Sequence, residues 1–338
     1  VYGGNGLRGY TSDYTHDGDY ALIGRQGALC GNINRTQGKA YISEHAIAVS
    51  GGENSDTEWL AQKLDYMKLN RLSESSAQPG LSVNKLVRIK IFAPSLLEQQ
   101  KIATFLSAVD KKIQQLQRKK ELLEQYKKGV MQKIFSQEIR FKDEDGNNYP
   151  EWEEVQLGDI ADRITSKNSA NEYKAVLTNS ATQGIVNQRD FFDKDIANQN
   201  NLEGYYIVSE DDFVYNPRIS KFAPVGPIKR NKLSQGVMSP LYSVFRFRGP
   251  VQEYFEYYFE TTLWYHYLKN VANYGARHDR MNITNSDFMK MPLSVPSSKE
   301  MKKVVFFIGG VSKILNHSDN ILSRMQEFKR GLLQQMFV

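Results

Sequence analysis

The side chains of this 338-residue chain that could carry chemistry are mostly polar and basic groups, not members of a catalytic cluster. No G-x-S-x-G nucleophile turn, P-loop or nuclease-like cluster of carboxylates occurs. The single cysteine, Cys30, excludes an internal disulfide and a cysteine-clustered zinc site. The histidines lack the i, i+4 pairing and the spacing of metal ligands: His16, His45, His266, His278 and His317. We therefore expect a protein that binds and does not catalyse, with no metal site.

The segment Gly4-Asn-Gly-Leu-Arg-Gly9 matches the dinucleotide-binding pattern G-x-G-x-x-G. That pattern holds pyrophosphate only when a strand precedes it and a helix N-terminus follows it. Residues 10–18 (YTSDYTHDG) follow here, and they cannot open a helix. The sequence predicts a glycine-rich turn.

A second short motif, Asn216-Pro-Arg-Ile219, resembles the Asn-Pro-Pro-aromatic box of adenine-amino methyltransferases. The second proline and the stacking aromatic are absent, and no methyl-donor loop accompanies the motif. We expect no methyltransferase activity from this chain itself.

Polar and basic side chains on expected loops and strand ends are the remaining candidates for binding. Arg, Asn and Gln can form paired hydrogen bonds with guanine and adenine edges, whereas Lys mostly contacts phosphate. Each residue taken singly is more often a solvated surface residue, and the clusters Lys221–Lys232 and Arg277–Arg280 stand out as groups. The DNA-binding candidates are Tyr2, Asn5, Arg8, Arg25, Gln26, Arg35, Lys39, Lys167, Asn179, Gln183, Arg189, Asn216, Arg218, Lys221, Lys229, Arg230, Arg277, His278 and Arg280.

Composition and charge agree with a polyanionic partner. The net charge is +6 and the pI is about 9.0, a mild bias toward nucleic acid. The segment from Ser95 to Lys142 contains eleven Lys and Arg but only five Asp and Glu. A solvent-exposed helix face would show the same excess of positive charge. No apolar run approaches the ~18 residues that would span a membrane. The length favours two domains.

Two long segments, 94–135 and 296–337, organise the chain. Apolar residues recur in each segment at three- and four-residue steps, and Lys120 and Lys127 break this pattern in the first segment. The pattern predicts two long amphipathic helices. These helices must pair, because each would otherwise expose its apolar stripe to water. The expected seam residues are Ile102, Leu106, Val109, Ile113, Leu116, Leu123, Val130, Ile134, Val304, Ile308, Val311, Leu315, Leu322, Met325, Leu332 and Met336.

The second segment repeats the first at an offset of 202 positions, from Pro94 to Pro296, without an insertion. The match continues outside the seam, as with Glu98 and Glu300, and predicts an internal duplication. The counterpart of Tyr149 would precede the first residue by about fifty positions, so we expect the first block to be N-terminally incomplete.

Each helical segment closes a block with mixed strands and helices. The pattern predicts strands at 20–24, 46–49, 81–92, 174–177, 205–208, 212–216 and 242–247, and helices at 57–68 and 251–272. The polar stretch 141–150 predicts a boundary between the blocks.

This pattern resembles the specificity (S, HsdS) subunit of type I restriction–modification systems. The likeness rests on Pro94-Ser-Leu-Leu-Glu-Gln-Gln-Lys-Ile-Ala-Thr-Phe-Leu and its weaker copy Pro296-Ser-Ser-Lys-Glu, with Gly24-Arg-Gln-Gly-Ala and Trp152 followed by Leu157-Gly-Asp-Ile. Met301-Lys302 replaces Gln99-Gln100 in the second copy.

The resemblance implies an α+β fold with two mixed α/β target recognition domains, each followed by a long helix, and a pseudo-two-fold duplication. The helices would pack as an antiparallel coiled coil. The expected domains are a first recognition domain at 1–93, a first spacer helix and connector at 94–142, a second recognition domain at 143–295 and a second spacer helix at 296–338.

The resemblance also implies a non-catalytic cytoplasmic subunit that reads a bipartite, asymmetric target in double-stranded DNA. Two modification (M) subunits would supply S-adenosylmethionine and adenine methylation, and restriction (R) subunits would supply ATP- and Mg-dependent cleavage, so no cofactor is expected in this chain. The alternatives are a coiled-coil adaptor that does not read DNA and, more weakly, part of a fused enzyme whose catalytic half lies elsewhere.

Overall fold

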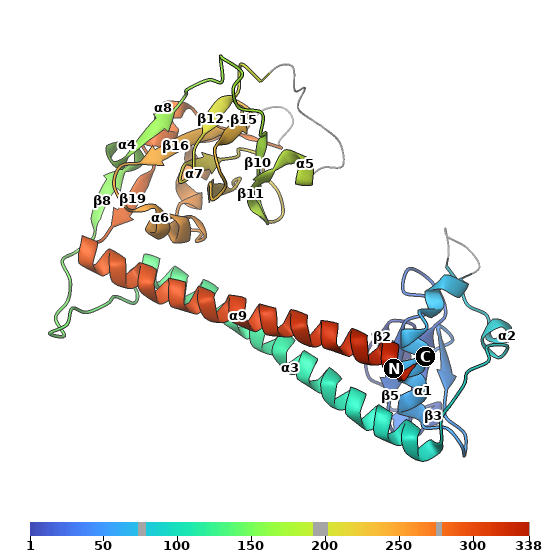
Figure 1. The fold of residues 1–338 in the computed structure, drawn as a ribbon. Coiled ribbons are helices and arrows are strands. Elements are labelled where there is room, and N and C mark those ends of the chain that lie inside the picture. Colours follow the sequence, from blue (N-terminus) through green and yellow to red (C-terminus); the bar gives the residue numbers. More distant parts are fainter. Residues whose placement is uncertain (74–78, 192–201, 275–278, 338) are drawn as a thin grey trace. The chain divides into compact units, whose positions relative to one another are not determined.

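The computed structural model describes residues 1–73, 79–191, 202–274 and 279–337. They form two compact units, the first comprising Val1–Glu121 with Asn316–Val338 and the second Leu122–Leu315. Figure 1 shows the two long helices, α3 (Leu96–Phe135) and α9 (Ser298–Met336). The unit boundaries cut both helices, so each unit holds a part of each.

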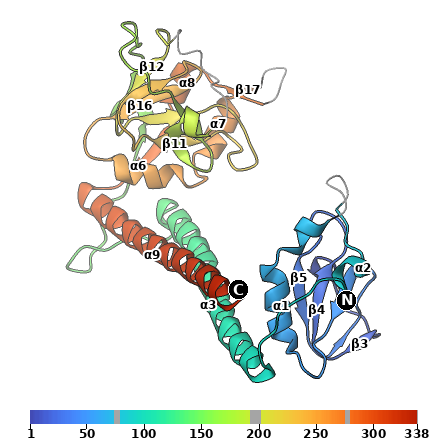
Figure 2. The same cartoon turned by 45° about the vertical axis from the view of Figure 1, so that its right-hand side comes forward.

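The first unit is built on an antiparallel sheet whose strands lie in the order β5 (Ile33–Thr36), β4 (Tyr20–Gly24) and β7 (Ala46–Val49). Helix α1 packs across β4 and β5 (Figure 2), and its N-cap Asp56 accepts a hydrogen bond from the Trp59 N–H at 2.8 Å. Ala21 and Ile23 of β4 contribute to the core beneath this helix. In chain order, the elements that precede α3 are β1 (Tyr2–Gly3), β2 (Gly6–Leu7), β3 (His16–Asp17), β4 (Tyr20–Gly24), β5 (Ile33–Thr36), β6 (Lys39–Ala40), β7 (Ala46–Val49), α1 (Thr57–Tyr66), a 3₁₀ turn (Leu69–Leu72) and α2 (Val83–Leu86).

The second unit has a four-stranded antiparallel sheet in the order β14-β13-β16-β9. Aromatic residues fill its core, with Phe247 stacked on Phe255 at 4.2 Å between ring centroids. Its elements are β8 (Glu153–Gln156), α4 (Leu157–Ile160), β9 (Ala161–Ile164), β10 (Leu177–Ser180), β11 (Gly184–Asn187), α5 (Gln188–Phe191), β12 (Tyr206–Val208), β13 (Phe213–Tyr215), β14 (Ile228–Arg230), β15 (Gly236–Met238), β16 (Ser243–Phe247), α6 (Gln252–Phe259), α7 (Tyr265–Val271), β17 (Asn273–Tyr274), β18 (Met281–Asn282), α8 (Asn285–Met289) and β19 (Pro292–Val295).

The two units repeat one plan. In the first unit, the central strand β4 lies between the next strand in sequence, β5, and a later strand, β7. In the second unit, β13 lies between β14 and β16 in the same way. The single turn α2 and the helix α8 begin 202 positions apart, as do α3 and α9. The α+β architecture and the duplication predicted from the sequence are therefore confirmed.

In the first unit, α3 and α9 pair antiparallel. Two ion pairs fix the direction: Asp110 with Lys329 at 2.5 Å and Lys120 with Asp319 at 2.6 Å, so ten positions forward on α3 correspond to ten positions back on α9. Around these pairs, the apolar residues of both helices form one cluster, namely Val109, Ile113, Leu116, Leu322, Met325 and Leu332. Lys120, which breaks the apolar seam in the sequence, is therefore an ion-pair position.

The second unit continues this pairing with the other parts of the two helices. Met131 and Ile134 of α3 join Val304 and Ile308 of α9 in the main core of the unit. Lys127, the second break in the seam, bonds at 3.0 Å to Glu260, which caps the end of α6. All sixteen seam residues expected from the sequence are buried or partly buried.

A buried carboxylate marks the start of α9. Glu300 has no exposed surface and accepts hydrogen bonds from the Arg140 guanidinium, at 2.9 and 3.3 Å, and from the Trp152 indole N–H at 3.0 Å. The hydrogen bond to Glu300 raises the pKa of Arg140 above its ordinary value. This pair ties the connector after α3 to the first turn of α9.

Some local predictions were wrong. The expected strand at 81–92 is instead the single turn α2, whose neighbours Leu81, Ile89 and Ile91 pack into the first core without pairing in a sheet. The expected helix at 251–272 is divided into α6 and α7. Where α6 ends, the Thr261 hydroxyl donates to the Tyr258 carbonyl at 2.7 Å. The strand expected at 174–177 begins at Leu177.

Across the described ranges, no helix combines the length and the apolar character required to cross a membrane.

Candidate nucleic-acid interface

The loop after β13 is held in place by several hydrogen bonds. The Asn216 side chain donates to the Asn179 carbonyl at 3.0 Å and accepts from the Arg218 backbone N–H at 3.0 Å. Ile219 N–H donates to the Asp279 carbonyl and Met281 N–H to the Pro217 carbonyl, both at 3.0 Å. These backbone hydrogen bonds hold two loops, far apart in sequence, side by side. Arg218 and Arg280 lie opposite each other in the resulting bridge.

These loops and the β10–β11 turn line a pocket of about 420 Å³, which we call the arginine pocket. Arg218 and Arg280 line it and are exposed, and neither guanidinium has a partner among the residues that the structure describes. Their five-donor fork suits a planar acceptor edge. The rim carries Phe222, 70% exposed, and Leu241, 59% exposed.

Asn179 supports this pocket from below. It is only 3% exposed, and its amide donates to the Val214 carbonyl at 2.7 Å and to the Pro227 carbonyl at 3.1 Å. The side chain therefore holds the loop in place and does not present its edge at the surface.

The first unit repeats the loop pair after its own central strand. Leu81 N–H donates to the Arg25 carbonyl and Gly27 N–H to the Pro79 carbonyl, both at 2.9 Å, and Gln26 bridges Gly80. Arg25 and Gln26 are exposed. Each unit thus places an exposed arginine just beyond its central strand.

The glycine-rich segment at the N-terminus forms a hairpin, as predicted, and no helix follows it. Tyr2 pairs with Leu7 across the turn, Asn5 is exposed at the tip, and Arg8 is exposed just beyond β2. Gly4 packs so closely that a Cβ would lie 2.6 Å from the His45 carbonyl oxygen. Gly4 thus serves close backbone packing, and Gly6 serves the turn with a φ of 92°.

Comparison with known proteins identifies the first unit. Residues 3–125 match the family "Type I restriction modification DNA specificity domain". Residues 3–125 of this chain are therefore similar to a type I restriction–modification DNA specificity domain.

Two named relatives share segments with it. The specificity subunit of type I restriction enzyme EcoprrI from Escherichia coli is 48% identical over 109 residues, which are 32% of this chain and 27% of the relative. The MjaVIII specificity subunit from Methanocaldococcus jannaschii is 32% identical over 151 residues, which are 43% of this chain and 33% of the relative. The matches thus span a third or less of each relative.

Solved structures share the fold. An S subunit of a type I restriction–modification system from M. genitalium superposes with a TM-score of 0.61 at 14% identity, covering 100% of this chain and 88% of that chain. A chain from a study of complex assembly and conformational transition of the type I system has a TM-score of 0.54 at 16% identity, covering 96% and 82%.

Some of the residues predicted to bind DNA form ion pairs within the fold. Arg230 is bound to Asp211 and Glu256. Arg35 is bound to Glu58 at 2.7 Å, with both side chains about one-third exposed. These ion pairs make both arginines poorer candidates for a base contact than Arg218.

Other predicted residues lie at the surface without converging on one place. Lys39 lies over the Tyr14 ring at 4.7 Å, and Tyr2 is half-buried in β1. Arg277 and His278 lie outside the described residues. Exposed or partly exposed in the second unit are Lys167, Gln183, Arg189, Lys221 and Lys229.

Sequence reasoning missed two surface residues of the second unit. Phe222 was not selected, although an exposed aromatic beside Lys221 is a usual companion of nucleic-acid contacts. Lys128 was treated as part of a charged helix face, and its neighbours across the fold could not be known from the sequence. No group of three or more potential metal ligands occurs within the described ranges.

Proposed function

We propose that this chain is the DNA-recognition subunit of a type I restriction–modification complex and that it reads a bipartite, asymmetric target in double-stranded DNA. The observation that supports this most directly is the repeated plan: each unit carries the same strand order and an exposed arginine, Arg25 or Arg218, on a fastened loop. Two recognition units of different sequence would read two different half-sites.

The arginine pocket is the proposed base-reading surface of the second unit. Arg218 and Arg280 converge on it from two loops whose backbones are hydrogen-bonded together, so their positions are set before DNA arrives. An arginine that meets guanine through O6 and N7 makes the commonest sequence-specific contact in the major groove.

The paired helices are proposed to act as the spacer between the half-sites. Helix α3 runs without interruption for 40 residues, which at 1.5 Å per residue is about 60 Å. An antiparallel partner with an apolar seam and two ion pairs stiffens it.

Partner subunits are proposed to dock on the long helices. Both helices keep apolar side chains exposed outside their shared seam, including Leu97 at 64%, Phe306 at 85% and Phe328 at 51%. Two M subunits would bring S-adenosylmethionine and the methylating site, and R subunits would bring ATP and Mg. We assign no catalytic role to this chain and propose that it acts in the cytoplasm.

Binding to duplex DNA across a salt series tests the proposal against the adaptor alternative. With M subunits present, a recognition subunit should bind duplex with an affinity that falls steeply as salt rises, since counterions are released from neutralised phosphates. An adaptor would bind M-like partners and show no duplex binding at any salt concentration.

Replacing Arg218 with alanine should weaken binding to the target duplex by about 5- to 150-fold, corresponding to ~1–3 kcal/mol for a lost guanine contact. Affinity for random duplex should change little. Lys290→Ala, an exposed lysine outside the arginine pocket, is the matched control and should bind both duplexes like the unmodified chain. An equal loss on target and random duplex would assign Arg218 to phosphate.

A further inference from the structure

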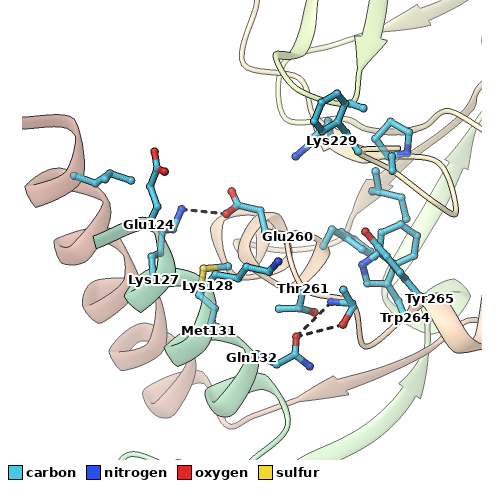
Figure 3. A pocket seen from close by; sticks show the side chains of 18 residues that line it. Glu124, Lys127, Lys128, Met131, Gln132, Lys229, Glu260, Thr261, Trp264 and Tyr265 are labelled. Atoms are coloured by element: carbon cyan, nitrogen blue, oxygen red, sulfur yellow. Dashed lines mark hydrogen bonds and ion pairs between the residues drawn. The ribbon is translucent and has the colours of Figure 1, made fainter. Parts of the chain in front are cut away.

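A second pocket of the Leu122–Leu315 unit lies between the last turns of α3 and the segments that follow β13 and α6, and we call it the lysine pocket (Figure 3). Its volume is about 330 Å³. Lys127 and Lys128 of α3 form one wall, Trp264 the opposite wall, and Lys229 of β14 a third side.

Two ammonium groups in this pocket lack internal partners. Lys127 is held by Glu260 at 3.0 Å and lies over the Tyr257 ring at 5.4 Å. Lys128 and Lys229 have no hydrogen-bond or ion-pair partner for their side chains within the described part of the chain. They come from different elements and face the same space.

A third donor is built into the opposite wall. Trp264 is 2% exposed, and its indole N–H is buried without a hydrogen-bond partner among the described residues. A buried N–H without an acceptor costs stability, so native structures rarely keep one that no acceptor can reach. Figure 3 shows the Trp264 indole across the pocket from Lys128.

We propose that the lysine pocket binds one phosphodiester group of the DNA backbone. A phosphodiester carries a negative charge and offers only acceptor oxygens, which match two ammonium groups and an N–H. Three lysines against two glutamates, Glu124 and Glu260, line the pocket, and Lys127 already neutralises Glu260. The proposal rests on DNA binding as proposed above.

The location gives this contact a positioning role. Phe222 and Pro227 line both the lysine pocket and the arginine pocket, so the two are neighbours. Phosphate contacts fix the register and orientation of a protein on the duplex and carry no sequence information. A phosphate held by Lys128 and Lys229 would therefore set where the Arg218 loop meets the bases.

The test compares variants of the full chain, together with its M subunits, on random-sequence duplex. Lys128→Gln and Lys229→Gln should each lower the affinity, and each should flatten the slope of log K against log salt by up to about 0.9, the value for one phosphate contact. The double variant should flatten the slope by no more than about 0.9 as well, because both lysines contact the same phosphate. Trp264→Phe should lower the affinity with an unchanged slope.

Lys269→Gln, an exposed lysine on α7 outside the pocket, is the control and should keep the affinity and the slope. If the unmodified complex binds duplex but both pocket variants keep its affinity and slope, the lysine pocket is not a backbone contact, and the proposed function stands. If the unmodified complex shows no salt-dependent duplex binding, both proposals fail.

A separate arm distinguishes DNA phosphate from a free anion. Inorganic phosphate is titrated into the complex while tryptophan fluorescence is followed, with Trp264→Phe identifying the responding residue. Weak binding that competes with duplex supports the proposal. Saturable binding that leaves duplex affinity unchanged would assign the pocket to a free anion and overturn it.

Discussion

Replacing Glu300 with alanine is expected to lower the free energy of unfolding of the second unit by about 3–5 kcal/mol. Glu300 is completely buried and is the shared acceptor of the Arg140 guanidinium and the Trp152 indole N–H. Without it, the Trp152 indole N–H loses its acceptor, and Arg140 keeps Glu151 and the Tyr149 and Pro150 carbonyls but loses the buried carboxylate. The connector after α3 also loses its tie to α9. Urea denaturation followed by tryptophan fluorescence measures the change, because Trp152 lies at the site.

Glu121→Ala is the matched control, since Glu121 pairs with Arg118 at the surface with both side chains more than half exposed. Its loss should cost no more than about 0.5 kcal/mol. Glu300→Gln should fall between the two, because an amide oxygen still accepts a hydrogen bond but cannot neutralise Arg140. Equal denaturation midpoints for Glu300→Ala and Glu121→Ala would show that the buried pair does not stabilise the unit.

Inserting four residues after Gln117 of α3, with four residues inserted beside Leu322 of α9, is expected to lengthen the gap between the half-sites. Leu116 and Leu322 belong to one apolar cluster, so paired insertions lengthen both helices at the same level. Four residues add about 6 Å of helix, roughly two base pairs at 3.4 Å each. Sequencing of methylated adenines in cells that express the complete system measures the gap.

Substitutions that preserve helix length provide the control. Gln114, Gln115 and Gln117 are exposed, and changing all three to alanine should leave the gap unaltered. A methylated motif with an unchanged gap in the insertion variant, from a complex that still methylates, would refute the spacer role of the helices.

The long helices could be predicted because their signal is local and repeated. Seam residues such as Leu106 and Ile308 recur with a period set by helix geometry alone, and all are at least partly buried in the structure. The duplication offset of 202 was also readable, and it relates the starts of α3 and α9. The direction of pairing required the contacts themselves, as Lys120 with Asp319 shows.

The candidate site was only partly predictable because it depends on which distant residues meet. Arg218 and Arg280 lie 62 positions apart, and their backbone bridge brings them to one pocket. Asn179 and Arg230 looked like surface donors, yet one is buried beneath the loop and the other is bound to two carboxylates. Residue type and local pattern do not distinguish a free side chain from one already paired within the fold.

Mapping methylated adenines in DNA from cells that express this chain with its partner subunits tests the central claim most directly. The account predicts a motif of two specified parts separated by unspecified bases, and it predicts that Arg218→Ala relaxes one part while the other stays intact. A continuous motif, relaxation of both parts together, or the same motif when this chain is absent would contradict recognition of one half-site by each unit.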